Sequence, residues 1–352
     1  MENKQTIFFK AEANNQVGEG HLHRCILLAD ECMKAGFGVG FIFADSSISS
    51  IEKAIKLGYK IHIITKQHQL DSETYLEFVP KYSLILFDTD NPIFYTGELI
   101  SNLRINNIKT ACFTISDLNE ISTDILINPN IISKTHTYLT PKTTKKLLGP
   151  KYLIFNKEYR AINTKKKTFN YPLNLLLFFG NADTHHLTRY FIRIIDSLGF
   201  YLRKVIIIVG SLNSDTEEIN DFIKNIESVE ISLHNNISTN RMIQLYKETD
   251  IAITSAGKSM WEMALFYIPQ IVIASSTRET TYTDYISQLG YIHKLCNYTE
   301  LPTSKMMGAK IINILESRKM ETLKTKEFYS IINPDGVKEI CCNFLEIIKH
   351  NN

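Results

Sequence analysis

The stretch TIFFKAEANNQVGEGHLHRCILLADECMKAG, residues 6–36, decides the fold class. Its apolar start is typical of a β-strand, and its glycine-rich middle is typical of a loop. The remainder places six apolar side chains on one face of a helix that ends at Gly36. These six are Leu22, Cys25, Ile26, Leu28, Ala29 and Cys32. A strand, a glycine loop and a helix in this order open a parallel α/β sheet.

The same order returns in the second half of the chain, in LNLLLFFGNADTHHLTRYFIRIID, residues 173–196. Between the two halves lies NTKKKTFNYP, residues 163–172, whose three consecutive lysines and proline are typical of a linker. We therefore predict an α/β protein with two Rossmann-like domains, residues 1–165 and 166–352, whose parallel sheets face a central cleft. The last helix could pack back on the first domain.

Further apolar runs predict the other strands of the two sheets. They lie at residues 38–45, 59–64, 82–90, 108–117, 125–132, 203–210, 229–235, 250–257 and 270–276. Ligands of such sheets bind beyond the carboxyl ends of the strands. The loops that follow the strands are therefore the places to look for chemistry.

The composition excludes several classes of protein. The 352 residues are 44% apolar, and the formal net charge is +2, which favours neither nucleic acid nor an anionic membrane as a partner. No apolar run is long enough to span a bilayer, and the start of the chain lacks the pattern of a signal peptide, so we expect a cytoplasmic protein. The six cysteines include no C-x-x-C pair, so we expect reduced thiols and no metal. The oligomeric state does not follow from the sequence.

The turn in DIAITSAGKSMWEMALFYIP, residues 250–269, is a candidate nucleotide site. The small residues Ser255 and Gly257 would let a diphosphate approach the backbone at a helix start. Lys258 and Ser259 could add a charge and a hydroxyl, and Glu262 could accept both hydroxyls of a ribose. The structural alternative is a solvated turn with Glu262 on an exposed helix face.

A second candidate stretch, FFGNADTHH, follows another strand. We assign Gly180 and Asn181 to the same nucleotide, while Asp183 could equally serve only as a helix cap. The two following histidines have no third ligand at suitable spacing, so a surface pair is favoured over a metal site. Arg278, further along the chain, could stabilise charge on a departing diphosphate.

The opening loop calls for a different role. Glu19, between Gly18 and Gly20, would repel a phosphate but suits the hydroxyl or amide groups of a sugar. His21 stands at the start of the helix, where the helix dipole favours the neutral imidazole that can accept a proton from water. The alternative is a helix-entry residue with a satisfied hydrogen bond.

Two aspartates could assist at this loop. Asp88 and Asp90 end a buried strand, and either could orient His21 or bind the sugar.

Together these runs resemble the UDP-sugar hydrolases of pseudaminic acid biosynthesis (the PseG/SpsG family), which are similar in turn to GT-B glycosyltransferases such as MurG. The resemblance covers most of the chain. Its most specific parts, in combination and in this order, are VGEGHLHRC and SAGKSMWEMALFYIP. The other parts are FDTD, SDLNE with DILINPN, LLGPKYLIFNKEYR, FFGNAD and NPDG.

The resemblance implies a GT-B-like fold with UDP held mainly by the C-terminal domain. It implies hydrolysis at the anomeric carbon of a UDP-diacetamido-trideoxyhexose, with UDP and the free sugar as products and no cofactor. His21 matches the family's catalytic histidine and would activate water as general base, with inversion of the anomeric centre.

Two other functions remain open from the sequence. A glycosyltransferase would use the same UDP site, with His21 deprotonating an acceptor hydroxyl in place of water. A protein that has lost its chemistry would bind the UDP-sugar without turnover.

Overall fold

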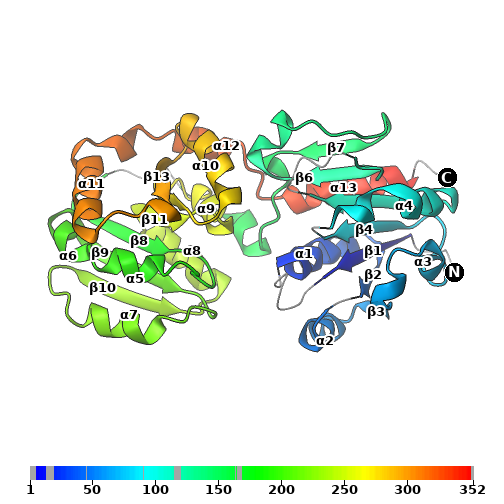
Figure 1. Ribbon diagram of the computed structural model, residues 1–352, viewed down its shortest axis with the longest axis horizontal. Coiled ribbons are helices and arrows are strands. Elements are labelled where there is room, and N and C mark those ends of the chain that lie inside the picture. The colour runs from blue at the N-terminus through cyan, green and yellow to red at the C-terminus, as the bar shows by residue number, and fades with distance from the viewer. Residues whose placement is uncertain are drawn as a thin grey trace. The chain divides into compact units, whose positions relative to one another are not determined.

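The computed structural model describes residues 5–12, 20–44, 46–89, 91–114, 120–162, 164 and 169–349 (Figure 1). The chain divides into two compact units. The N-terminal unit consists of Met1–Phe155 and Asn333–Asn352, and the C-terminal unit consists of Asn156–Ile332. The first boundary between the units, after Phe155, precedes the predicted domain boundary at residue 165. The reason is that the Tyr159 and Thr164 hydroxyls donate to Glu262 and to the Leu265 carbonyl, both in the C-terminal unit.

The N-terminal unit is built on a seven-stranded parallel sheet in the order β3-β2-β1-β4-β5-β6-β7. Its strands are β1 (Thr6–Ala11), β2 (Gly38–Phe43), β3 (Lys60–Ile63), β4 (Leu84–Asp88), β5 (Lys109–Phe113), β6 (Ile125–Asn128) and β7 (Lys145–Leu148). All five residues of β4 are buried, as expected for a central parallel strand covered on both faces.

Helices cover both faces of this sheet. They are α1 (Gly20–Lys34), α2 (Ile48–Lys56), α3 (Ser72–Leu76), α4 (Gly97–Ile105) and α13 (Gly336–Lys349). Ile7 and Phe9 of β1 face a core shared with α1 and α13, while Phe8 faces a core shared with α3 and α4. The alternation along β1 thus feeds two hydrophobic cores, one on each face.

The last helix belongs to the N-terminal unit, although it follows the whole C-terminal unit in sequence. Figure 1 shows α13 in red beside the blue and cyan elements of that unit. Val337, Ile340 and Phe344 are buried in the core that α1 also lines. A Cβ atom at Gly336, where α13 begins, would lie 2.4 Å from the Leu153 carbonyl oxygen, so only glycine permits this close approach.

The C-terminal unit contains a six-stranded parallel sheet in the order β10-β9-β8-β11-β12-β13. Its strands are β8 (Leu173–Phe178), β9 (Leu202–Val209), β10 (Glu230–Asn235), β11 (Ile251–Ser255), β12 (Gln270–Ala274) and β13 (His293–Asn297). Its helices are α5 (Leu187–Ile192), α6 (Ile195–Leu198), α7 (Thr216–Ile223), α8 (Thr239–Glu248), α9 (Lys258–Ala264), α10 (Thr277–Gln288), α11 (Ser304–Glu316) and α12 (Thr325–Ser330).

Both sheets reverse their strand order once. The reversal lies between β1 and β4 in the N-terminal unit and between β8 and β11 in the C-terminal unit. At such a point the connections leave in opposite directions and open a crevice at the carboxyl ends of the strands. The predicted residues His21 and Asp88 follow or end strands at the first reversal, and Gly180 and Ser255 do so at the second.

The prediction of two Rossmann-like domains with parallel sheets is confirmed, but two strands are missing from it. They are β7 and β13, the last strand at one edge of each sheet. Each pairs on one side only, and both contain polar residues that break the apolar run used to find strands. In the part of the chain that the structure describes, no helix is long and apolar enough to cross a membrane.

Candidate active site

The N-terminal unit places a histidine beside a buried aspartate. His21 is the second residue of α1, and Asp88 is the last residue of β4. The sheet brings them together, because Ala11 at the end of β1 pairs with Asp88, and α1 is the next helix after β1. His21 Nδ1 lies 2.6 Å from Asp88 Oδ1. The predicted base and one of its predicted orienting acids are therefore in hydrogen-bond contact.

Arg24, which is not among the predicted residues, completes this group. Its Nε atom lies 2.5 Å from Asp88 Oδ2, and its Nη2 atom donates to Asp88 Oδ1. The guanidinium also lies over the Phe113 ring, 4.7 Å from its centre. The signal in the sequence is the spacing, because residues three apart on a helix share a face, and Arg24 follows His21 by three.

Asp88 is fully buried and nevertheless ionised. Burial by itself would raise the pKa of Asp88, but the charge and hydrogen bonds of Arg24, together with His21, outweigh it and lower the pKa to about 2. The Cys25 thiol also donates to Asp88, over 3.3 Å, and burial raises the pKa of this thiol well above its usual value. Asp88 is thus a fixed acceptor of hydrogen bonds throughout the neutral pH range.

This environment assigns the two ring nitrogens of His21. An ionised carboxylate only accepts, so Nδ1 of the neutral imidazole carries the hydrogen and donates it to Asp88. Arg24 Nη2 lies 3.1 Å from Nδ1. It is itself a donor, so it cannot accept the hydrogen that Nδ1 carries. Nε2 therefore keeps its lone pair. A histidine oriented by an aspartate in this way is suited to act as a general base.

The other residues predicted on the sugar side are less defined. Gly20 is the first residue of α1, and a Cβ atom there would meet nothing within 4 Å, so packing does not require glycine. Gly18, Glu19 and Asp90 lie outside the described residues.

A second charged pair lies close by at the carboxyl end of β1. The buried Lys10 Nζ atom is 2.5 Å from Glu12 Oε1 and 4.6 Å from the centre of the Phe94 ring. Neither member of this pair is predicted as a site residue.

The C-terminal unit contains a cavity of about 250 Å³ where β8, β11 and β12 end. Gly180, Ser255 and Gly257, three of the residues predicted to bind the nucleotide, line it. Gly180 has a φ of +88°, a conformation that glycine adopts at little cost. The other lining residues are Phe179, Ala182, Asp183, Thr184, His185, Leu187, Ser275 and Glu279.

Five predicted nucleotide-binding residues do not line this cavity, namely Asn181, Lys258, Ser259, Glu262 and Arg278. The Asn181 side-chain oxygen accepts a hydrogen bond from the Ser211 amide over 2.9 Å. Ser259 is buried in the first turn of α9. Arg278 is exposed at the second position of α10.

The side chain of α10 that does line the cavity is Glu279. Its Oε2 atom accepts hydrogen bonds from the amide and the hydroxyl of Ser275, each over 2.7 Å.

Glu262 forms a separate polar group with two tyrosines. The hydroxyls of Tyr159 and Tyr246 donate to Glu262 Oε2 over 3.1 and 3.3 Å, and Lys258 Nζ lies 3.9 Å from Oε1. Burial raises the pKa of Glu262, although Lys258 and both hydroxyls oppose the shift. Burial also lowers the pKa of Lys258, against the attraction of Glu262. The two tyrosines thus bind Oε2, while Oε1 has Lys258 as its charge partner.

The adjacent histidines point to different partners. The His185 ring stacks on Tyr298, with ring centres 3.8 Å apart, and His185 also lines the cavity. His186 Nδ1 lies 2.6 Å from Asp215 Oδ2. Among the residues that the structure describes, no three histidine, cysteine, aspartate or glutamate side chains are grouped to hold a metal ion.

Comparison with known proteins supports the fold. The structure of Acinetobacter baumannii MurG superposes with a TM-score of 0.69 at 12% identity, covering 97% of this chain and 99% of that one. The fold is of the GT-B type. The pneumococcal O-GlcNAc transferase GtfA, solved in complex with UDP and GlcNAc, gives a TM-score of 0.59 at 10% identity, covering 99% of each chain.

Sequence comparison is less informative. No family model matches the chain. A protein of Methanocaldococcus jannaschii, the uncharacterised MJ1062, is 24% identical over 291 residues. The match covers 79% of this chain and 57% of that protein, so the chain spans little more than half the length of this relative.

Proposed function

We propose that the protein hydrolyses a UDP-sugar at the anomeric carbon, releasing UDP and the free sugar. The observation that carries this proposal is the contact between His21 and the ionised Asp88, which leaves Nε2 of His21 able to accept a proton. A base held in this way can activate water. The group lies at the strand-order reversal of its sheet, the position where open α/β sheets bind ligands.

The nucleotide would bind in the C-terminal unit. The ribose hydroxyls would donate to Glu262 Oε1, whose charge partner is Lys258. The diphosphate would lie against Gly180, Ser255 and Gly257. Two of these have no side chain and the third has a small one, so a ligand could approach their backbone amides closely. The solved structure of the transferase GtfA, which contains UDP, supports the choice of nucleotide.

The carboxylates of Asp183 and Glu279 line the same cavity. Their negative charge would repel a diphosphate unless hydrogen-bond donors offset it. Asp183 accepts hydrogen bonds from the amides of Leu187 and Thr188, and Glu279 accepts two from Ser275. Burial also raises the pKa of Asp183, despite those bonds. Both carboxylates thus already accept hydrogen bonds from residues four or five positions away in the chain.

In the reaction, UDP leaves from the anomeric carbon as a good leaving group. Water attacks from the opposite side through an oxocarbenium-like transition state, and His21 Nε2 accepts its proton. Attack opposite to UDP inverts the anomeric centre. The Asp88 carboxylate stabilises the imidazolium that forms. Lys258 and Arg278 are the cations that we propose for the charge on departing UDP.

The identity of the sugar is the most specific part of the proposal. The runs VGEGHLHRC and SAGKSMWEMALFYIP resemble those of hydrolases that act on UDP-2,4-diacetamido-2,4,6-trideoxyhexoses in pseudaminic acid biosynthesis. We propose a substrate of this class, in which two acetamido groups present hydrogen-bond donors and acceptors.

A glycosyltransferase is the second candidate. The fold of MurG and GtfA favours it, because both are similar over almost the whole chain. His21 would then deprotonate an acceptor hydroxyl, and the nucleotide would bind as described. The two functions differ only in what attacks the sugar.

The deciding experiment is UDP release from UDP-diacetamido-trideoxyhexoses with no acceptor added, followed by NMR of the sugar. We expect release of UDP and a free reducing sugar whose first anomer is inverted. Retention of configuration would contradict direct attack by water. Binding without release until an acceptor is added would establish the transferase.

Replacement of Glu262 by alanine is expected to weaken UDP binding by about tenfold or more, because the ribose would lose a charged hydrogen-bond acceptor. Isothermal titration of UDP measures the change. The matched control is Glu316→Ala, which removes an exposed partner of Tyr201 elsewhere in the same unit. An unchanged dissociation constant in the Glu262 variant would remove the ribose assignment.

A further inference from the structure

The loop between β8 and α5, residues 179–186, supplies most of the lining of the nucleotide cavity. It has an unusual backbone. Asp183 and His186 have φ angles of +45° and +54°, and Gly180 has one of +88°. Side chains with a Cβ atom adopt this left-handed conformation only at a cost, so surrounding contacts must hold the loop in shape.

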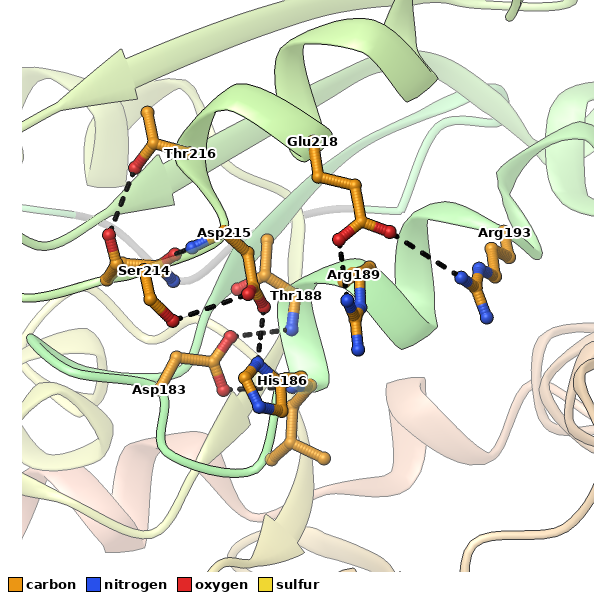
Figure 2. A network of polar contacts seen from close by, with 11 residues as sticks. Asp183, His186, Thr188, Arg189, Arg193, Ser214, Asp215, Thr216 and Glu218 are labelled. Carbon is orange, nitrogen blue, oxygen red and sulfur yellow. Dashed lines mark hydrogen bonds and ion pairs between the residues drawn. The ribbon is translucent and has the colours of Figure 1, made fainter.

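Part of that support comes from the loop itself, as Figure 2 shows. The Asp183 carboxylate accepts hydrogen bonds from the amides of Leu187 and Thr188 over 2.9 and 2.8 Å. The His186 amide donates to the Asp183 carbonyl over 2.9 Å. These bonds fix the end of the loop to the first turn of α5.

The rest of the support comes from the loop between β9 and α7, residues 210–215. Asp215 Oδ2 lies 2.6 Å from His186 Nδ1 (Figure 2), and the Ser211 amide and hydroxyl donate to Asn181 Oδ1 over 2.9 and 3.2 Å. The approach is close, since a Cβ atom at Gly210 would lie 2.3 Å from both the Cα and the carbonyl oxygen of Asn181.

Asp215 is well placed to act as the fixed end of this contact. It is 8% exposed, its own amide donates to Asn213 Oδ1 over 2.8 Å, and the Ser214 hydroxyl contacts its other carboxylate oxygen. It does not line the cavity. Any effect on a ligand would therefore act through the β8–α5 loop.

We propose that the β9–α7 loop positions the nucleotide-binding loop, with Asp215 as a positioning residue that acts through His186. The inference rests on the proposed function, because the cavity is taken as the diphosphate site. Without the Asp215 contact, His186 loses the side-chain partner that offsets its left-handed backbone. The cavity wall would then populate other conformations, and the ligand would bind only the fraction that keeps the native one.

The test measures UDP affinity by calorimetry in the chain of 352 residues. Asp215→Ala and His186→Ala should each weaken binding by about five- to tenfold, as loss of one partly buried charge-assisted hydrogen bond predicts. The double variant should be no worse than the single ones, because both remove the same contact. Asp215→Asn should retain part of the affinity, since an amide oxygen can still accept the hydrogen bond.

Glu218→Ala is the matched control. Glu218 connects the two helices that follow these loops, since it lies in α7 and its carboxylate is 2.5 Å from Arg189 of α5 and 3.8 Å from Arg193, the next residue after α5 (Figure 2). Both of its partners lie outside residues 179–186. UDP should bind this variant as it binds the unmodified protein. Equal weakening in Glu218→Ala and Asp215→Ala would show general destabilisation and overturn the positioning role.

Hydrogen exchange in the protein without ligand separates this inference from the proposed function. Amides of residues 183–188 should exchange faster in Asp215→Ala and at the normal rate in Glu218→Ala. Unchanged exchange in Asp215→Ala would overturn the inference even if UDP binds. Faster exchange together with no UDP binding by the unmodified protein would support the loop contact and reject the nucleotide assignment.

Discussion

Replacement of His21 by asparagine is expected to lower kcat for UDP release by about 10²–10⁴-fold, the usual contribution of a general base. Asparagine can still donate to Asp88, but it offers no ring nitrogen whose lone pair could take a proton from water. The UDP dissociation constant should stay within about twofold, because removal of a general base lowers kcat without weakening the binding of the nucleotide. Turnover at saturating substrate and titration of UDP give the two numbers.

His68→Asn is the control for this variant. The His68 side chain is 61% exposed in the same unit, and its Nδ1 atom lies 4.0 Å from Asp71 Oδ2. We propose no role for it in binding or catalysis. The His68 variant should turn over normally. Near-normal kcat in His21→Asn would remove His21 from the mechanism, and a large loss of UDP affinity with kcat unchanged would make it a binding residue.

The fold was predictable because its decisive signals are local. The six apolar side chains assigned to one face of the first helix are the six that α1 buries. The edge strands β7 and β13 were not predictable in this way. Lys145 and Lys146 make up half of β7, and a strand that pairs on one side only needs no continuous apolar run.

The candidate site was predictable only in part, because local patterns identify strand ends but not contacts between residues that are distant in the sequence. The positions of His21 and Asp88 follow from strand ends, which a parallel sheet gathers at one edge. Tyr159, by contrast, reaches Glu262 across 103 residues of sequence, and no local pattern reports such a contact. Arg278 and Glu279 show a second limit. Successive side chains on a helix point about 100° apart, so the position of the helix start does not tell which of the two lines the cavity.

Replacement of Asp88 by asparagine is expected to destabilise the N-terminal unit by about 3 kcal/mol, the lower end of the range for breaking a buried ion pair. The fully buried carboxylate is the charge partner of Arg24, whose side chain is only 29% exposed. An amide cannot neutralise the guanidinium, and it leaves one of the donors around it unpaired. The lower end applies because Arg24 retains some contact with water.

The same substitution should remove an acid-sensitive part of the stability. The folded-state pKa of Asp88 is lowered from 3.8 to about 2, so its contribution is present above pH 3.8 and is lost as the pH falls towards 2. That shift corresponds to about 2 kcal/mol. Asp88→Asn should therefore show a smaller fall in unfolding free energy between pH 4 and pH 2 than the unmodified protein.

Denaturant unfolding can assign this loss to the correct unit. The single tryptophan, Trp261, lies in α9 of the C-terminal unit, so its fluorescence reports on that unit, while circular dichroism reports on both. Asp88→Asn should shift the circular dichroism transition. Asp71→Asn, at an exposed helix cap where asparagine serves as well, should leave it in place. An unshifted transition in Asp88→Asn would mean that Arg24 finds another partner, and the buried ion pair would then not be what orients His21.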